Sequence, residues 1–258
     1  MNVFSSSFVL IRREWKRFFR QRSRVISSVL TPVLFWGLMG MGFGKSFDMP
    51  FSNGGYLEYF FPGVLLMTLL FSSIFSMISL IEDRNEGFLQ SVLVSPISHA
   101  SVVFGKILGA ATLSIFQTML LLPFSYVVGV PLNLPIIIML LAIFSVTAVF
   151  LCSLSFLFAW ILNSTQGFHA VMNILLFPMW ILSGAMFPMK TSSGLIQWIM
   201  AFNPLTYALD ATRKIFYAGT DWFSPFDGMQ IYGDFLLMTC LCIGMVSLSF
   251  LLVKKSYQ

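Results

Sequence analysis

The sequence predicts an all-α membrane protein with six transmembrane helices. Hydrophobic residues make up 57% of its 258 residues and charged residues only 10%, whereas a soluble domain is about 25% charged. The apolar runs are continuous and about 20 residues long, which is the length of a helical span, and they lack the strand alternation of a membrane β-barrel. The chain therefore holds one membrane domain, with no room for a soluble catalytic domain.

The leading segment, residues 1–24, predicts an amphipathic helix in the membrane interface. Helical intervals of four and three residues separate the apolar side chains Phe4, Phe8, Ile11, Trp15 and Phe18. Seven basic residues fall largely off this stripe: Arg12, Arg13, Lys16, Arg17, Arg20, Arg22 and Arg24. An aromatic face opposite a basic face is typical of a helix at the surface of an anionic membrane.

Six apolar runs follow, and each is long enough to cross the bilayer as a helix. They cover residues 25–44, 60–81, 102–130, 136–162, 168–187 and 235–253. Two segments between them are not simple turns, namely 82–99 and 188–234. The second is too long for a turn and too apolar for a solvated loop. Within it we expect two short helices, near 195–202 and 204–217, that rest on or dip into the outer leaflet.

The basic residues predict that both ends of the chain are cytoplasmic. In that orientation eleven of the 15 basic residues fall in inside segments and four in outside segments. Cytoplasmic loops are enriched in lysine and arginine, so the count disfavours the opposite orientation.

Two Gly-x-x-x-Gly pairs lie in the apolar part of the chain. They are Gly40 with Gly44 and Gly105 with Gly109. Such pairs allow two helices to approach closely, but they also arise by chance. The sequence leaves both interpretations open for each pair.

Sites for nucleotides, metals or catalysis are not evident in the sequence. Met39 stands where a phosphate-binding loop ending at Lys45 and Ser46 would need its first glycine. His99 and His169 are far apart, so no metal is expected. The spans also lack the mid-depth ionisable residues of ion-coupled carriers. We therefore expect no enzyme activity and no cofactor in the chain, and either a separate ATPase that powers transport or a passive channel or scaffold.

The segment 82–96 begins with alternating charges and then becomes amphipathic. Phe88, Val92 and Leu93 fall on one face of a short helix that Pro96 would end. Such a helix can insert its side chains into a moving partner protein. The alternative is a solvated turn between two spans, and the periodicity alone does not decide between them.

Three stretches of the sequence together resemble the ABC-2 type exporter permeases. The stretch 82–98 resembles the cytoplasmic loop of that family, 182–188 the end of its fifth span, and 203–213 its outer Pro-x-x-Tyr…Arg motif. Their order and spacing agree over nearly the whole chain. No large extracellular domain is present, which argues against the sterol-type and macrolide-type exporters.

The resemblance implies a half-transporter in the bacterial inner membrane that pairs with a second permease copy or a sister permease. Two ATPase subunits would bind ATP and Mg²⁺ beneath it and drive export of an amphipathic, lipid-like or drug-like substrate. Coupling to the ATPase would fall to Glu82, Arg84, Glu86, Gly87, Phe88 and Leu89. The outer gate region would include Pro204, Tyr207 and Arg213.

The resemblance also implies that the first, second and fifth spans face the partner protomer. Aromatic and methionine side chains on these spans would suit a bulky apolar substrate. The candidate pathway residues are Phe35, Trp36, Met39, Phe71, Phe75, Met172, Phe177 and Trp180. The alternative for each is ordinary packing or contact with lipid.

Overall fold

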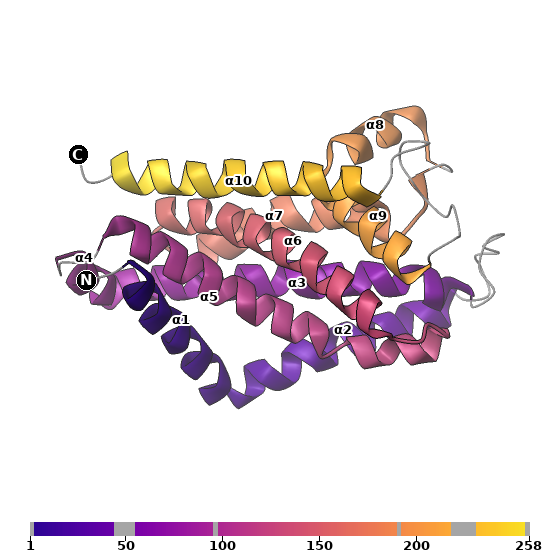
Figure 1. Ribbon diagram of the computed structural model, residues 1–258, viewed down its shortest axis with the longest axis horizontal. Coiled ribbons are helices and arrows are strands. Elements are labelled where there is room, and N and C mark those ends of the chain that lie inside the picture. Colours follow the sequence, from indigo (N-terminus) through magenta and orange to yellow (C-terminus); the bar gives the residue numbers. More distant parts are fainter. Residues whose placement is uncertain (1–2, 44–54, 95–97, 190–191, 218–230, 256–258) are drawn as a thin grey trace.

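Six long apolar helices lie side by side along the long axis of the molecule (Figure 1). The computed structural model describes residues 3–43, 55–94, 98–189, 192–217 and 231–255, and these contain helices and no strand. The long helices are α2 (Arg22–Phe43), α3 (Gly55–Asn85), α5 (His99–Met119), α6 (Leu134–Ile161), α7 (Thr165–Trp180) and α10 (Ile231–Lys255). Each belongs to a segment long and apolar enough to cross a membrane, which confirms the predicted fold class.

Helix α3 forms the centre of the bundle. It packs against α2, α5, α6 and α7, and 83% of its most apolar window is buried. Two of its buried hydroxyl groups are satisfied within the helix itself, since Thr68 and Ser73 donate to the carbonyls of Val64 and Leu69. The first residues of the segment 82–99 belong to the same continuous helix as the core, because α3 extends to Asn85.

Two of the six crossings are less regular than the sequence suggested. The third was expected to be one helix over 102–130, but α5 ends at Met119 and a 3₁₀ helix, η1 (Leu122–Val128), continues it. Pro123 explains the change, because it cannot donate a hydrogen bond and its ring clashes with the carbonyl four residues earlier. In the fifth crossing, α7 gives way to a π-helical segment, η2 (Ile181–Ala185), which contains Gly184 at φ 91°.

Helix α1 (Val3–Arg20) precedes α2 and packs along α5. A Cβ atom on Gly105 would lie 2.8 Å from the Leu10 side chain, and one on Gly109 would lie 3.2 Å from Glu14. The Gly105/Gly109 pair therefore serves close helix packing. A Cβ on Gly40 would likewise clash with Leu57, while Gly44 lies outside the described residues.

Three short helices occupy the two ends of the bundle. Helix α4 (Phe88–Val94) lies at the end that holds the start of α1 and the finish of α10, which we call the terminal end (Figure 1). Helices α8 (Gly194–Phe202) and α9 (Pro204–Phe216) lie toward the opposite end. They confirm the two short helices expected near 195–202 and 204–217. Pro96 and 218–230 lie outside the described residues.

Candidate functional site

The junction between α3 and α4 is a tight turn at Gly87. This residue has φ 76°, a backbone conformation that favours glycine. Its N–H donates to the Arg84 carbonyl at 3.1 Å, and its carbonyl accepts from the N–H of Ser91 at 3.1 Å. One residue thus closes α3 and begins α4, so the direction of α4 depends on the conformation of Gly87.

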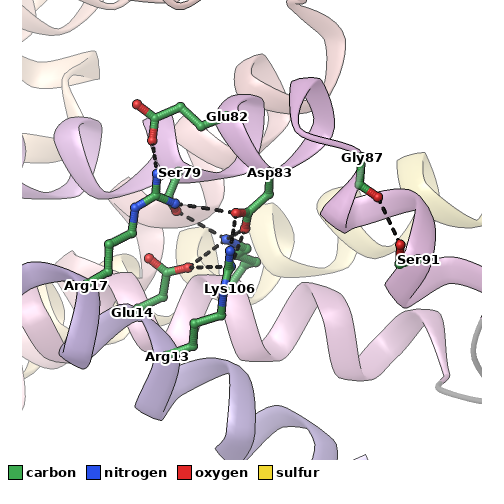
Figure 2. A network of polar contacts seen from close by, with 9 residues as sticks. All are labelled: Arg13, Glu14, Arg17, Ser79, Glu82, Asp83, Gly87, Ser91 and Lys106. Carbon is green, nitrogen blue, oxygen red and sulfur yellow. Dashed lines mark hydrogen bonds and ion pairs between the residues drawn. The ribbon is translucent and has the colours of Figure 1, made fainter.

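A cluster of six charged residues joins α1, α3 and α5 beside this junction. We call it the charge cluster, and Figure 2 shows its members: Arg13, Glu14, Arg17, Glu82, Asp83 and Lys106. Arg13 donates to both carboxylate oxygens of Asp83 at 2.6 Å each. Lys106 lies between two carboxylates, with its Nζ 2.6 Å from Glu14 and 2.5 Å from Asp83. Arg17 pairs with Glu82.

The cluster is electrically balanced, with three positive and three negative side chains. Asp83, Lys106 and Glu14 have side-chain exposures of 0%, 2% and 6%, so each depends on its partners for the interactions that water would otherwise supply. Lys106 also donates to the Ser79 hydroxyl at 3.2 Å. The hydrogen bond to Asp83 raises the pKa of the Arg13 guanidinium above its ordinary value.

The charge cluster touches α4 directly. The Arg13 guanidinium lies 3.8 Å from the centre of the Phe88 ring, within the range of a cation–π contact. Leu89 is buried in the hydrophobic core at 4% exposed, whereas Glu86 is exposed. Helix α4 therefore has one side fixed to the bundle and presents polar side chains, including Gln90 and Ser91, at the surface.

Arg84 binds the end of α6 rather than the charge cluster. Its guanidinium donates to the carbonyls of Ala159, Trp160 and Leu162 at 3.3, 2.6 and 3.2 Å, and to the Asn163 side chain at 3.2 Å. A cation at a helix C-terminus is stabilising because the last carbonyls lack intrahelical partners. Arg84 thus ties the α3–α4 junction to α6.

The structure places the predicted coupling residues beside five charged residues that were not predicted. The candidates Glu82, Arg84, Phe88 and Leu89 contact other elements, whereas Gly87 forms the turn and Glu86 is exposed. The missed members of the charge cluster are Arg13, Glu14, Arg17, Asp83 and Lys106. Two of them carried a signal, since Glu14 is the only acid in the leading segment and Lys106 is isolated in an apolar run.

A second polar site joins α9 to η2 and α3 near the opposite end. The Tyr59 hydroxyl donates to the Gly184 carbonyl at 2.6 Å, and Arg213 donates to the same oxygen at 2.9 Å. The Arg213 guanidinium also lies 4.2 Å from the Tyr59 ring centre. Two donors therefore hold the carbonyl of the left-handed glycine inside the π-helical segment.

The other outer candidates shape α9 itself. Asn203 caps the helix by accepting from the Leu205 N–H at 3.0 Å, and Pro204 occupies the first turn, where no donor is needed. The Tyr207 hydroxyl donates to the Ala201 carbonyl at 2.6 Å, which links α9 back to α8. These contacts fix the angle between the two short helices.

Lys214 bridges α9 and α10 through two carboxylates. Its Nζ lies 2.6 Å from Asp210 and 2.6 Å from Asp234, and both acids are buried. Burial raises the pKa of Asp210 to about 7. The Lys214 ammonium opposes this effect, and the nearby Asp234 charge reinforces it. This triad was not predicted from the sequence.

The candidate pathway residues divide into buried, half-buried and exposed groups. Trp36, Met172 and Trp180 are buried, and the indoles of the two tryptophans donate to the carbonyls of Leu57 and Gly63. The half-buried members are Phe35, Met39 and Phe71, and the exposed ones are Phe75 and Phe177. The structure brings Phe35 against Trp180, with 6.1 Å between ring centres, and Phe71 against Phe75, at 6.2 Å.

Within the described residues, no group of three or more His, Cys, Asp or Glu side chains is arranged to hold a metal ion. The cysteines Cys152, Cys240 and Cys242 are free thiols. The polar clusters consist of ion pairs and backbone contacts, which suit the joining of helices.

Known proteins are similar to this chain over most of its length. The ABC-2 type transporter family matches residues 6–217. The chain is 30% identical to ycf38, named as a transport permease, from Cyanophora paradoxa, over 83% of this chain and 75% of the relative. It is 26% identical to nodulation protein J of Azorhizobium caulinodans, over 93% and 91%. It is 24% identical to the daunorubicin resistance ABC transporter permease protein DrrB1 of Streptomyces coeruleorubidus, over 91% and 80%. The chain therefore belongs to the ABC-2 type transporter family and is an integral membrane permease of the ABC transporter class.

Proposed function

We propose that this permease is the membrane subunit of an ATP-driven exporter and that α4 receives the motion of a separate ATPase subunit. The observation that carries the proposal is the contact between α4 and the charge cluster. A displacement of α4 would act on Phe88 and Leu89, and Phe88 lies against Arg13, which holds Asp83. Because the same cluster contains Lys106 of α5, three helices would respond together.

The orientation that fits this function places the terminal end of the bundle in the cytoplasm. Basic residues favour the cytoplasmic side of a membrane. Four of them belong to helix ends at the terminal end or to the α1–α2 turn: Arg20, Arg22, Lys254 and Lys255. Helices α8 and α9 would then lie in the outer leaflet. Exposed apolar side chains of α8, among them Trp198 at 69% and Phe202 at 80%, support contact with lipid. A bacterial inner membrane is the location that the bacterial relatives favour.

The substrate we propose is an amphipathic, lipid-like or drug-like molecule, taken from the cytoplasm or the inner leaflet. The name of one relative refers to daunorubicin resistance, which supports export of a drug-like compound. A second permease, identical or related, would complete the pathway, and the exposed face of α7 is available for it. Pro204, Tyr207 and Arg213 would control the outer end.

The test begins with purification of the tagged chain from its native membranes. We expect an ATPase with a phosphate-binding loop to co-purify. A Gln90→Cys variant, in a background without the native cysteines, should cross-link to it, whereas a Ser193→Cys variant should not. Export by reconstituted vesicles should continue when ionophores collapse all ion gradients and should stop when the catalytic base of the ATPase is removed. Transport that requires a gradient and survives loss of ATP hydrolysis would refute the proposal.

A further inference from the structure

A cavity of about 400 Å³ lies between α2 and α3, and one residue of α5 completes its wall. This volume is within the range of small-molecule sites. We call it the α2–α3 pocket. Its polar lining consists of hydroxyl and amide side chains: Ser27, Ser28, Thr31, Thr68, Ser72 and Gln117. The ion pairs of the charge cluster and of the Lys214 triad involve none of these residues.

Several polar groups of the pocket have hydrogen-bonding capacity to spare. The Ser72 hydroxyl is buried, at 5% exposed, and makes no hydrogen bond within the described residues. Pro32 has no N–H to offer to the carbonyl of Ser28, one turn earlier in α2. Gln117 is 4% exposed, and its side-chain amide can both donate and accept. Burial without partners costs free energy, so a ligand that supplies donors and acceptors would be stabilised here.

No charged side chain lines the pocket, among the residues that the structure describes. A cationic or anionic group that entered would lose its hydration and meet no opposite charge, which is strongly unfavourable. The rest of the wall is apolar and comes from Pro32, Met67, Phe71 and Phe75. The lining therefore selects an uncharged polar group with some apolar surface.

The pocket opens at the surface of α2 beside an apolar stripe. Ser27 and Thr31 are exposed, and four neighbouring side chains are more than half exposed: Ile26, Leu30, Leu34 and Leu38. Ser27 follows the basic start of α2 by less than two turns. Basic residues at a helix end mark the headgroup level of a membrane. A molecule seated in one leaflet would thus meet the mouth of the pocket near its own polar head.

We propose that the α2–α3 pocket binds the uncharged, hydroxyl- or amide-bearing head of an amphipathic molecule, whose apolar tail leaves along the exposed stripe of α2. This inference rests on the proposed function, because it gives the chemical class of the exported substrate. Ser72 and Gln117 hydrogen-bond the head group, and Phe71 and Phe75 cover its apolar face. The pathway candidates Phe71 and Phe75 would thus contact the head group of this molecule.

The test uses three photoreactive probes with the same diazirine-bearing dodecyl chain. Their heads are glucose, trimethylammonium and phosphate. The full chain is extracted without glycoside detergent, since such a detergent is itself a neutral amphiphile, and is placed in phosphatidylcholine nanodiscs. We expect the glucoside to label peptides that contain 26–38 or 67–75, and the charged probes not to label them. Ser72→Ala should raise the half-saturating glucoside concentration roughly 3- to 10-fold, the effect of losing one hydrogen bond.

Ser76→Ala is the matched control. Ser76 is a second buried hydroxyl of α3 without a hydrogen bond in the described residues, but it does not line the pocket. Its replacement should leave labelling unchanged, and Ser72→Phe, which fills the pocket, should abolish it. Equal labelling by a charged probe, or equal effects of Ser72→Ala and Ser76→Ala, would overturn the proposal. A third outcome would also overturn it: Thr31→Cys residues of two copies form a disulfide and the pocket is not labelled. The pocket would then be part of an interface between protomers.

The two proposals fail in different ways. Photolabelling of the pocket does not need an ATPase, so labelling without co-purification of an ATPase would refute only the proposed energy source. Co-purification with active ATP hydrolysis, but without labelling of the pocket, would refute only the assignment of the ligand.

Discussion

Arg13 and Asp83, 70 residues apart in sequence, form a bidentate ion pair with both distances at 2.6 Å. The same Arg13 covers the ring of Phe88, the first residue of α4. One guanidinium of α1 therefore contacts both the end of α3 and the short helix proposed to meet the ATPase. Because the guanidinium is planar and donates two hydrogen bonds to one carboxylate, it fixes both the distance and the orientation between Arg13 and Asp83. A single lysine ammonium would not do so.

Removing the positive charge at the centre of the charge cluster should destabilise the bundle. Lys106→Met leaves Glu14 and Asp83 buried with one counter-charge fewer, and breaking a buried pair typically costs about 3–5 kcal/mol. Thermal unfolding in mild detergent measures the loss. Lys16→Met makes the same change at an exposed position of α1 and should have little effect. Adding Glu14→Gln to Lys106→Met should recover part of the loss, and purely additive effects would contradict a shared cluster.

The conformation of Gly87 should decide whether ATP hydrolysis drives transport. Gly87→Pro and Gly87→Val cannot adopt φ 76° without strain, which costs about 1–2 kcal/mol or more, whereas asparagine tolerates this region. We expect the first two variants, and also Glu86→Ala, to insert in the membrane but to lose substrate-stimulated ATP hydrolysis. Gly87→Asn should retain it.

Gly129 supplies the control for this series. It has the same φ of 76° and open space around it, but it caps η1 and is not part of α4. Gly129→Val should therefore lower stability to a similar degree without uncoupling. Full substrate-stimulated hydrolysis in Gly87→Pro would mean that the α3–α4 junction is only a turn.

Asp210 should make the stability of the protein depend on pH. Its pKa in the folded protein is raised to about 7 from 3.8, so its stabilising contribution is complete below about pH 4 and is lost as the pH rises through 7. Asp210→Asn removes this dependence and should be the more stable form at pH 8, by at most about 4 kcal/mol. Thermal unfolding between pH 5 and pH 8 should show the two curves diverging. Glu86→Gln, an exposed change, should run parallel to the wild type.

Tyr59 and Arg213 should show energetic coupling because they share the Gly184 carbonyl. Tyr59→Phe removes one hydrogen bond, worth about 1 kcal/mol. Arg213→Met removes the other donor and leaves the carbonyl dependent on Tyr59. A double-mutant cycle on the free energy of unfolding should give an interaction energy above about 0.5 kcal/mol. Strict additivity would indicate that one of the two contacts contributes nothing.

Labelling from one side of the membrane should establish the orientation. A cysteine at Ser193, which is exposed before α8, should react with an impermeant maleimide added outside intact cells, and one at Gln90 of α4 should not. The opposite pattern would reverse the membrane orientation and exclude contact between α4 and a cytoplasmic ATPase.

The six crossings were predictable because hydrophobicity and length alone define a span. The ends of the helices were less predictable. Helix α3 covers Gly55–Asn85, whereas the apolar run indicated 60–81. Its last turn contains Glu82, Asp83 and Arg84, whose charges made it resemble a loop. The structure shows those charges satisfied by α1, α5 and α6, which allows the helix to continue.

The charge cluster could not be predicted, because its pairs join distant parts of the sequence. Glu14 and Lys106 are separated by 92 residues, and no local pattern indicates which charges meet. The basic face expected on α1 is also only partly solvated, since Arg13 and Arg17 turn toward α3. Hydrophobic periodicity identifies the faces of a helix, but the partner of each charge depends on tertiary packing.

The docking of α1 on α5 has a consequence for the order of assembly in the cell. The ribosome makes Glu14 long before Lys106, and at about 5–20 residues per second the delay is roughly 5–20 seconds. During that interval α1 has neither the glycine surface nor the ammonium that it needs, so it remains at the membrane surface with its acid hydrated. Completion of the cluster therefore has to wait until α5 has been made, although α1 emerges first.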